Sequence, residues 1–294
     1  MPGEDDRSGE VRLPSGRTLS YACFGIEDGP TVVVLDGAGS RMQARAAHKI
    51  AERVGVRLIA PDRPGFGRSS PDPSGTLLTF ADDVTALTTA LNIERLGMWC
   101  QSAGAPFALA CAYRLRDRIT HLGILAGIGP LDAPGAFDGM NMAVRLSFHA
   151  ARRFPSLIEL QFRALAAINR RSPEHAARVL IASRPPRDRA VLSGPQWPTT
   201  VAAMGELTRS PAATAREFRL MAQPWGFDLA AVRVPTTIWQ GTADTVHPPS
   251  MARFMASRIP DATLHLEPGL STFDFLDRRD EMLRTVAPSD AATG

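Results

Sequence analysis

The sequence predicts an α/β fold in which a mostly parallel central sheet is flanked by helices and interrupted by an inserted helical cap. Short β-branched runs alternate with helical stretches through the first half, and the same alternation returns near the C-terminus. Strands that alternate with helices form parallel sheets covered on both faces. The 294 residues, of which 44% are hydrophobic, suffice for one large domain with an inserted subdomain.

The first half supplies most of the expected strands and the helices that connect them. Two strands around a Pro-Ser-Gly turn open the chain in VRLPSGRTLSYACFG. Continuous apolar runs, typical of buried parallel strands, follow in TVVVLDG, VRLIAPD, RLGMWC and HLGILAGIG. Helical periodicity lies between these runs, over about residues 43–54 and in LLTFADDVTALTTALNI and PFALACAYRLRD.

The alternation of strands and helices breaks after Pro130. Residues 131–228 show mainly helical periodicity, clearest in VRLSFHAARRF, SLIELQFRALAAINRR and EHAARVLIAS. The earlier pattern then resumes with PTTIWQGTAD, a helix in PSMARFMASRI, a strand in TLHLEP and a last helix from about Asp277. We therefore expect a core formed by residues 1–130 and 229–294, with a helical cap at residues 131–228.

The segment CQSAGAPFALA stands directly after an apolar strand and directly before a helix. This context is typical of a nucleophile elbow, a strained turn that exposes a serine between a strand and a helix. Ser102 and Gly104 match the serine and the last glycine of the usual G-x-S-x-G pattern, and Cys100 replaces the first glycine. The alternative is a buried serine that caps the helix.

Three further segments follow strands in the expected order. LDGAGSR follows the first core strand, APDRPGFGRSS follows the next, and GTAD ends the strand after the insertion. Together with the elbow they resemble the α/β-hydrolase superfamily, especially the branch whose oxyanion loop reads HGxPGSR. The resemblance spans nearly the whole chain outside the insertion. It implies the fold far more strongly than the reaction, because this fold hosts many chemistries.

The resemblance assigns roles to individual positions of this chain. Ser102 falls on the nucleophile and Asp244 on the acid of a Ser-His-Asp triad. The backbone N–H groups of Ala38 and Ala103 fall on the oxyanion hole, which requires no particular side chain.

Two polar residues depart from the family pattern beside these positions. Asp36 replaces the usual histidine of the oxyanion loop, and Gln101 precedes the serine. Both are candidate substrate-binding residues, and each could instead hold the loop or pack against it. Asp62 and Arg63 are expected to shape a turn and to have a structural role only.

The position that would hold the triad histidine carries a threonine. The family ending P-G-x-G-H-F-x-x-L-D places the histidine four residues after the proline, and counting from Pro268 gives Thr272. Phe273 and Leu276 agree with this register, and Leu270 is the second choice if the loop is realigned. Threonine cannot take the serine proton near neutral pH, so we expect Thr272 to line the site rather than act as the base.

Two other histidines are candidates for a substitute acid or base. His247 lies three residues after Asp244 on the same loop, near the strand ends where the site is expected. We therefore include His247 with Ser102 and Asp244 among the catalytic candidates. His149, on the first helix of the cap, is a second candidate that would contact substrate.

Three functions remain open from the sequence. The leading hypothesis is a non-hydrolytic biosynthetic enzyme, such as a cyclase, lyase or isomerase, that acts on a polyketide or terpenoid intermediate. Such reactions need orientation and a few hydrogen bonds rather than a relayed proton. The second hypothesis is a serine esterase that uses His247 as its base, and the third is a non-catalytic small-molecule binding protein.

Composition restricts the partners. The net charge of +3 is small and both signs are mixed along the chain, which argues against nucleic-acid binding. Bulky apolar residues in the cap predict an apolar small-molecule substrate, and no cofactor or metal motif is present in the sequence. Three cysteines, no signal peptide and no apolar run of about 18 residues predict a cytoplasmic protein without a membrane span. A homodimer stays open.

Overall fold

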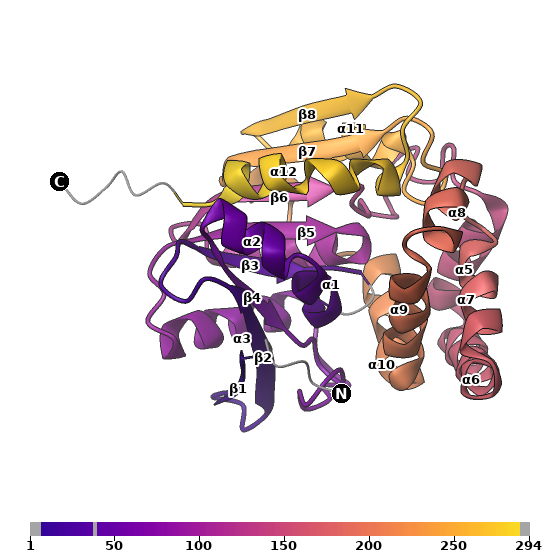
Figure 1. Cartoon of the computed structure of the whole chain (residues 1–294), viewed down its shortest axis with the longest axis horizontal. Helices are drawn as coiled ribbons and strands as arrows, with labels where there is room; N and C mark the ends of the chain where they lie inside the picture. Colours follow the sequence, from indigo (N-terminus) through magenta and orange to yellow (C-terminus); the bar gives the residue numbers. More distant parts are fainter. Residues whose placement is uncertain (1–6, 38–39, 289–294) are drawn as a thin grey trace.

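A single eight-stranded sheet forms the centre of the molecule, and a group of helices stands at one end of it (Figure 1). The computed structural model describes residues 7–37 and 40–288. The strands are β1 (Arg7–Arg12), β2 (Thr18–Gly25), β3 (Thr31–Leu35), β4 (Arg57–Pro61), β5 (Leu96–Gln101), β6 (Ile119–Leu125), β7 (Thr236–Gly241) and β8 (Ala262–Glu267).

The strand order brings three loops to the same edge of the sheet. The order is β1-β2-β4-β3-β5-β6-β7-β8. The pairs β1–β2 and β2–β4 are antiparallel, and the six strands β4, β3, β5, β6, β7 and β8 are parallel to one another. The loops after β3, β5 and β7 therefore leave the sheet on one side. In open α/β sheets, ligands bind outside these carboxyl ends.

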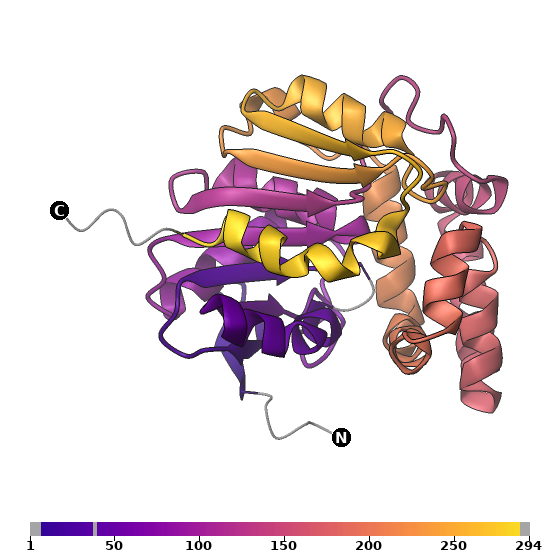
Figure 2. The same cartoon turned by 45° about the horizontal axis from the view of Figure 1, so that its top comes forward.

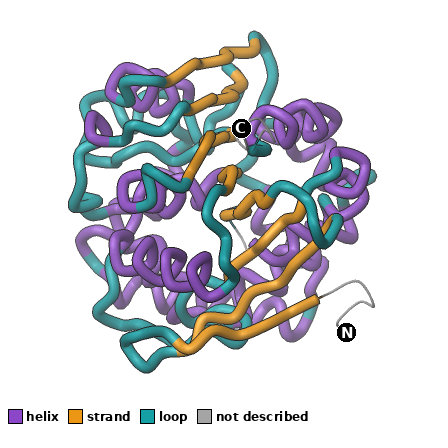
Figure 3. The backbone as a smooth tube through the Cα atoms, turned by 90° about the vertical axis from the view of Figure 1, so that its left-hand side faces the viewer, coloured by secondary structure: helices purple, strands orange, loops and turns teal. Residues whose placement is uncertain are grey.

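Helices cover both faces of the sheet, as Figures 2 and 3 show. The core helices are α1 (Ser40–Ala46), α2 (His48–Val54), α3 (Leu77–Ala90), α4 (Ala105–Arg114), α11 (Pro249–Arg258) and α12 (Arg279–Val286), with the 3₁₀ helices η1 (Ser102–Gly104), η2 (Leu229–Ala231) and η3 (Thr272–Arg278). One hydrophobic cluster joins α3, α4 and α11 to the sheet, and a second joins α1, α2 and α12 to its other face. Both faces of β3 are therefore buried, which explains its uninterrupted apolar sequence.

The insertion between β6 and β7 is helical and lies beyond the carboxyl ends of the strands (Figure 1). Its helices are α5 (Met142–Arg153), α6 (Pro155–Arg171), α7 (Pro173–Ile181), α8 (Pro186–Ser193), α9 (Trp197–Arg209) and α10 (Pro211–Ala222). Buried cap residues such as Ile158, Phe162 and Met221 form an apolar cluster that also includes Ile128 and Met251 of the core. The cap thus covers the sheet edge at which the three loops meet.

The α/β class and the helical insertion predicted from the sequence are confirmed. One difference concerns residues 43–54, where the single expected helix is two short helices, α1 and α2, with Ala47 between them. The boundaries of the cap at residues 131 and 228 stay a prediction. Within residues 7–37 and 40–288, no helix combines the length and apolar character that crossing a membrane requires.

Candidate active site

Ser102 stands on a strained turn between β5 and α4. Its backbone φ is 57°, a left-handed conformation that is uncommon for a non-glycine residue and that clusters at functional sites. Gly104 permits the turn, since a Cβ atom there would lie 1.8 Å from the carbonyl oxygen of Leu35. The local backbone therefore has the form of a nucleophile elbow.

His247 lies within hydrogen-bond distance of the serine. Its Nε2 atom is 2.9 Å from Ser102 Oγ, although 145 positions separate the two residues in the chain. The histidine comes from the loop that joins β7 to α11 and is almost completely buried. A base at this distance and position can accept the serine proton when the other ring nitrogen, Nδ1, carries a hydrogen.

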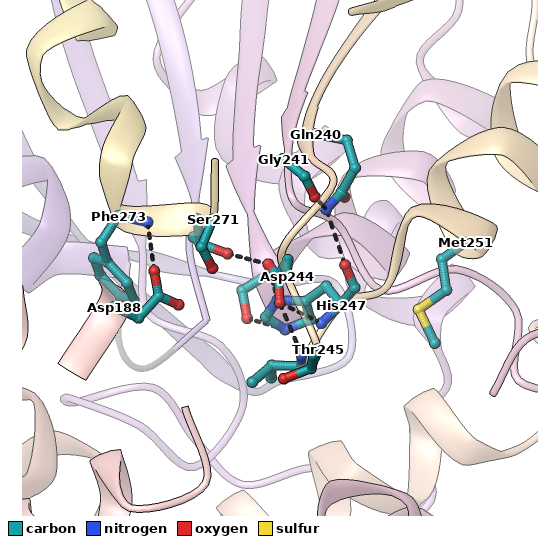
Figure 4. Close-up of polar contacts among 12 residues, drawn as sticks. Asp188, Gln240, Gly241, Asp244, Thr245, His247, Met251, Ser271 and Phe273 are labelled. Atoms are coloured by element: carbon teal, nitrogen blue, oxygen red, sulfur yellow. Dashed lines mark hydrogen bonds and ion pairs between the residues drawn. The ribbon is translucent and has the colours of Figure 1, made fainter. Parts of the chain in front are cut away.

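Asp244 orders the same loop and faces the imidazole ring (Figure 4). Its Oδ1 atom accepts hydrogen bonds from the backbone N–H groups of Val246 at 2.8 Å and His247 at 2.9 Å. Its Oδ2 atom lies 3.6 Å from His247 Nδ1, an ion-pair distance rather than a hydrogen bond. The carboxylate thus favours a proton or positive charge on the side of the ring that faces away from Ser102.

The backbone of this loop is held from the core and from the cap. The side-chain amide of Gln240 donates to the carbonyl oxygen of His247 at 2.9 Å, as Figure 4 shows. From the cap, the backbone N–H of Asn141 donates to the carbonyl oxygen of Thr245 at 2.8 Å. These two hydrogen bonds hold the backbone of the loop in place, and this fixes the position of His247 beside Ser102.

Thr272 contacts the carboxylate that a triad histidine would contact. Its hydroxyl donates a short hydrogen bond to Asp244 Oδ2, and its side chain is buried. Burial alone would raise the pKa of Asp244, but His247 and the Thr272 hydroxyl outweigh that effect and lower the pKa to about 2. Asp244 is therefore a stable anion, and both Thr272 and His247 contribute to that state.

Arg63 holds the backbone of the loop after β3. Its guanidinium donates to the carbonyl oxygens of Asp36 at 2.6 Å and Gly37 at 2.7 Å, and it forms a buried ion pair with Glu217 of α10. Gly37 packs closely against the elbow, because a Cβ atom there would lie 3.2 Å from Ser102 Oγ. The arginine thus fixes the approach of this loop to the serine.

The backbone N–H of Ala103 is one of the two donors that the sequence predicts for an oxyanion hole. Among residues 7–37 and 40–288, no protein acceptor lies within hydrogen-bond range of it, and Ala103 lines the cavity beside Ser102. Ala38, the second expected donor, lies outside the described residues. One half of the expected oxyanion hole is thus open to a ligand.

Asp36 and Gln101 lie beside the elbow, as expected from their places in the sequence. Burial raises the pKa of Asp36 to about 6, although the charges of Arg279 and Arg63 and the backbone N–H of Gln101 act in the opposite direction. Asp36 therefore changes charge near neutral pH within the wall of the cavity.

A cavity of about 200 Å³ opens above Ser102, between the cap and the carboxyl end of the sheet. Its apolar wall includes Leu192, Met221 and Phe273, and the predicted residues Asp36, Gln101, Ser102, Ala103 and Thr272 all line it. His247 does not line it, so the imidazole reaches the cavity through its contact with the serine oxygen. A volume below the usual range of roughly 300–1,000 Å³ favours a small ligand.

His149, the second candidate histidine, does not line the cavity above Ser102. It is exposed on α5, where its ring stacks on Phe137 with the centroids 4.8 Å apart, and it lines a separate surface depression. The buried face of the amphipathic helix α5 carries Phe148 and Ala151, and His149 lies on its exposed face.

A family model described as the alpha/beta hydrolase fold matches residues 30–278 of the chain. The chain belongs to this family. An uncharacterized hydrolase from Bacillus subtilis (strain 168), YcgS, is 26% identical over 113 residues, which are 38% of this chain. That alignment spans only 39% of the length of YcgS.

Solved structures agree with the alpha/beta hydrolase fold. An alpha/beta hydrolase fold protein from Nakamurella multipartita superposes with a TM-score of 0.67 at 24% identity, covering 94% of this chain and 99% of that one. A thermophilic esterase from Thermogutta terrifontis gives a TM-score of 0.67 at 22% identity, with 96% and 100% covered. At these identities the similarity supports the fold alone.

Within this alpha/beta hydrolase frame, four charged residues of the site escaped the sequence analysis or were treated as structural. Arg63 was expected to shape a turn, and Glu217, Arg184 and Arg279 carried no motif. Glu217, Arg184 and Arg279 line the cavity, and Arg63 pairs with Glu217. All four come from elements far apart in the sequence, so a linear pattern could not group them. In the described ranges, no group of three or more His, Cys, Asp or Glu side chains is arranged to hold a metal ion.

Proposed function

We propose that this chain is a serine hydrolase that cleaves small carboxylic esters or lactones, with Ser102 as nucleophile and His247 as base. The observation that carries the proposal is the distance of 2.9 Å between Ser102 Oγ and His247 Nε2. The leading hypothesis from the sequence, a non-hydrolytic enzyme, rested on the absence of a base. The imidazole of His247 supplies a base, so the geometry favours the second hypothesis.

The first step is acylation of the serine. Ser102 Oγ attacks the carbonyl carbon of the ester while His247 Nε2 takes the serine proton. The carbonyl oxygen becomes an oxyanion, which the N–H of Ala103 is placed to stabilise. The tetrahedral carbon then expels the alcohol oxygen, which takes the proton from Nε2 and leaves an acyl-serine.

Deacylation repeats these steps with water. His247 takes a proton from a water molecule that attacks the acyl carbon. The second tetrahedral intermediate then expels Ser102 Oγ, which takes the proton from His247 Nε2, and the carboxylic acid is released. Asp244 stabilises the imidazolium formed in each half, since its carboxylate lies 3.6 Å from Nδ1 and stays ionised. Names of similar proteins, a hydrolase and an esterase, support this reaction class.

Covalent labelling with a fluorophosphonate probe and turnover of para-nitrophenyl acetate test the proposal together. We expect stoichiometric labelling of the wild-type chain at Ser102 and none in Ser102→Ala. Both Ser102→Ala and His247→Ala should lower kcat by about 10⁴-fold or more, as removal of a triad member does in other serine hydrolases. His149→Ala is the matched control, because that histidine is exposed and outside the cavity.

Four results would contradict the proposal. Absence of labelling would contradict the role of Ser102 as nucleophile, and turnover that survives His247→Ala would contradict the role of His247 as base. Turnover of a ligand that is unaffected by Ser102→Ala would favour the non-hydrolytic enzyme instead. Tight binding of a ligand that is recovered unchanged would favour the binding protein.

A further inference from the structure

Two arginines line the cavity above Ser102, and each has a carboxylate near enough to act on it through its charge: Asp188 for Arg184 and Asp36 for Arg279. Arg184 comes from the cap, on the loop between α7 and α8, and Arg279 is the first residue of α12 in the core. Within residues 7–37 and 40–288, neither guanidinium forms an ion pair. Neighbouring arginines do, such as Arg187 with Asp274 and Arg278 with Glu267.

Arg184 is held in place by an aromatic ring and keeps an unused donor. Its guanidinium carbon lies 5.5 Å from the centroid of the Phe273 ring, and Phe273 also lines the cavity. Its Nη1 atom is buried and has no hydrogen-bond partner in the described part of the chain. A buried donor without an acceptor is costly, and a ligand oxygen would satisfy it.

Arg279 approaches the same cavity from the opposite layer of the molecule. Burial lowers the pKa of its guanidinium, and the charge of Asp36 acts against that effect. Glu217, the other acid of the wall, is already paired with Arg63. The wall thus carries two arginines, Arg184 and Arg279, and two acids, Asp36 and Glu217, of which Glu217 is already paired.

We propose that Arg184 and Arg279 bind a carboxylate carried by the substrate, so that the preferred substrates are small esters or lactones with a free carboxylate group. This inference rests on the proposed hydrolase function for the ester, and on the two arginines for the carboxylate. The planar fork of a guanidinium matches a carboxylate, and hydrogen bonds between charged groups are the stronger ones. The apolar substrate expected from the cap composition is thereby replaced by an anionic one.

The bound carboxylate would also connect the two parts of the molecule. Arg184 belongs to the cap and Arg279 to the core, so one anion between them contacts both. The cavity of about 200 Å³ leaves room for a short substrate only. A monoester of a short dicarboxylic acid has the required pair of groups.

Calorimetric binding to Ser102→Ala tests the proposal without depending on turnover. The ligands are monomethyl succinate, an anion, and dimethyl succinate, its neutral counterpart of similar size. We expect the anion to bind at least about tenfold more tightly, as for a charge-assisted hydrogen bond in a partly buried site. Arg184→Gln and Arg279→Gln should each weaken the anion about tenfold, and the double variant should lose the preference.

Arg178→Gln is the matched control, because Arg178 is an exposed cap arginine that pairs with Glu174 and lies outside the cavity. Circular dichroism and thermal unfolding confirm that each variant is folded. Equal affinity for the two ligands, no detectable binding of either, or a preference that survives the double variant would overturn the carboxylate site. The reaction is judged separately: hydrolysis of neutral esters without an anion preference contradicts this inference only, and arginine-dependent anion binding without any turnover contradicts the hydrolase only.

Discussion

Thr272 and His247 both contact Asp244. Thr272 donates its hydroxyl to Asp244 Oδ2, and His247 supplies the imidazole from a position three residues after the acid. Because both contact one buried carboxylate, the effect of each on Asp244 can be measured as a change of stability with pH.

Thr272→Val removes a hydroxyl at nearly constant volume. The pKa of Asp244 is about 2 in the folded chain, below its ordinary value of 3.8. Its contribution to stability is therefore present above about pH 4 and is lost as the pH falls toward about 2. We expect Thr272→Val to be less stable than the wild type by about 1.5–3 kcal/mol at pH 6, with the difference shrinking below about pH 4.

Urea unfolding between pH 3 and pH 6 measures this difference. Thr272→Ser keeps the donor and should restore most of the loss, as well as the kcat lost in Thr272→Val. A loss of stability that is the same at every pH would assign Thr272 to packing instead.

Asp36 predicts the opposite trend with pH. Burial raises the pKa of Asp36 from 3.8 to about 6, so the folded chain holds a proton that the unfolded chain has released. The contribution of Asp36 to stability is then greatest below about pH 4 and is lost as the pH rises through about 6. The unfolding free energy of Asp36→Asn minus that of the wild type should therefore increase by on the order of 2–3 kcal/mol between pH 4 and pH 7.

Comparison of the two unfolding curves isolates this group, since other carboxyl groups titrate alike in both proteins. Parallel curves across this range would mean that Asp36 keeps an ordinary pKa. The same comparison with Asp132→Asn, at an exposed position, serves as the control.

At the scale of single elements, the strand–turn–helix at Ser102 depends on one missing Cβ atom. Gly104 has ordinary helical dihedral angles, so alanine there is conformationally allowed and only the contact with the Leu35 carbonyl forbids it. We expect Gly104→Ala to cost about 1–3 kcal/mol by overpacking and to suppress labelling of Ser102. Labelling kinetics and urea unfolding measure the two effects.

Gly205 in α9 is the matched control, because nothing lies within 4 Å of a Cβ atom placed there. Gly205→Ala should stabilise the chain by about 0.5–1 kcal/mol through helix propensity, with unchanged labelling. If both substitutions had the same effect, the close approach of β3 to the elbow would be irrelevant.

The elements themselves follow from local pattern, whereas the contents of the site do not. The buried runs of β3, β5 and β7 and the turn at Ser102 are visible in the sequence because burial on both faces requires continuous apolar residues. His247 was selected as a candidate because it shares a loop with Asp244. The exposure of His149 could not be predicted, because it depends on which face α5 turns toward the core, and packing between helices sets that face.

At the scale of the whole molecule, contacts between the core and the cap decide the charge of the cavity. Arg63 and Glu217 lie 154 positions apart, and Arg184 and Arg279 lie on different layers. A linear pattern carries no signal for such pairs, because each residue taken alone resembles an ordinary surface arginine or glutamate. Only the folded arrangement shows that Glu217 is paired with Arg63, whereas Arg184 and Arg279 form no ion pair within the described part of the chain.

The ion pair between Arg63 and Glu217 connects the loop after β3 to α10 of the cap. Both side chains are almost completely buried, at 2% and 6% exposure, so removing one partner leaves the other charge without compensation. We expect Glu217→Leu to lower the unfolding free energy by about 3–5 kcal/mol. The double variant Arg63→Met/Glu217→Leu should recover part of this loss, because no charge is then left unpaired.

A double-mutant cycle by urea unfolding measures the coupling between the two residues. The pair Arg163–Glu159 on α6 is the control, because it is largely exposed and Glu159→Ala should change stability by at most about 1 kcal/mol. Labelling of Ser102 should slow in both Arg63→Met and the double variant, since each loses the donors to the Asp36 and Gly37 carbonyls. Additive losses in the cycle, or labelling that is unaffected by Arg63→Met, would show that the cap and the oxyanion loop are not connected through this pair.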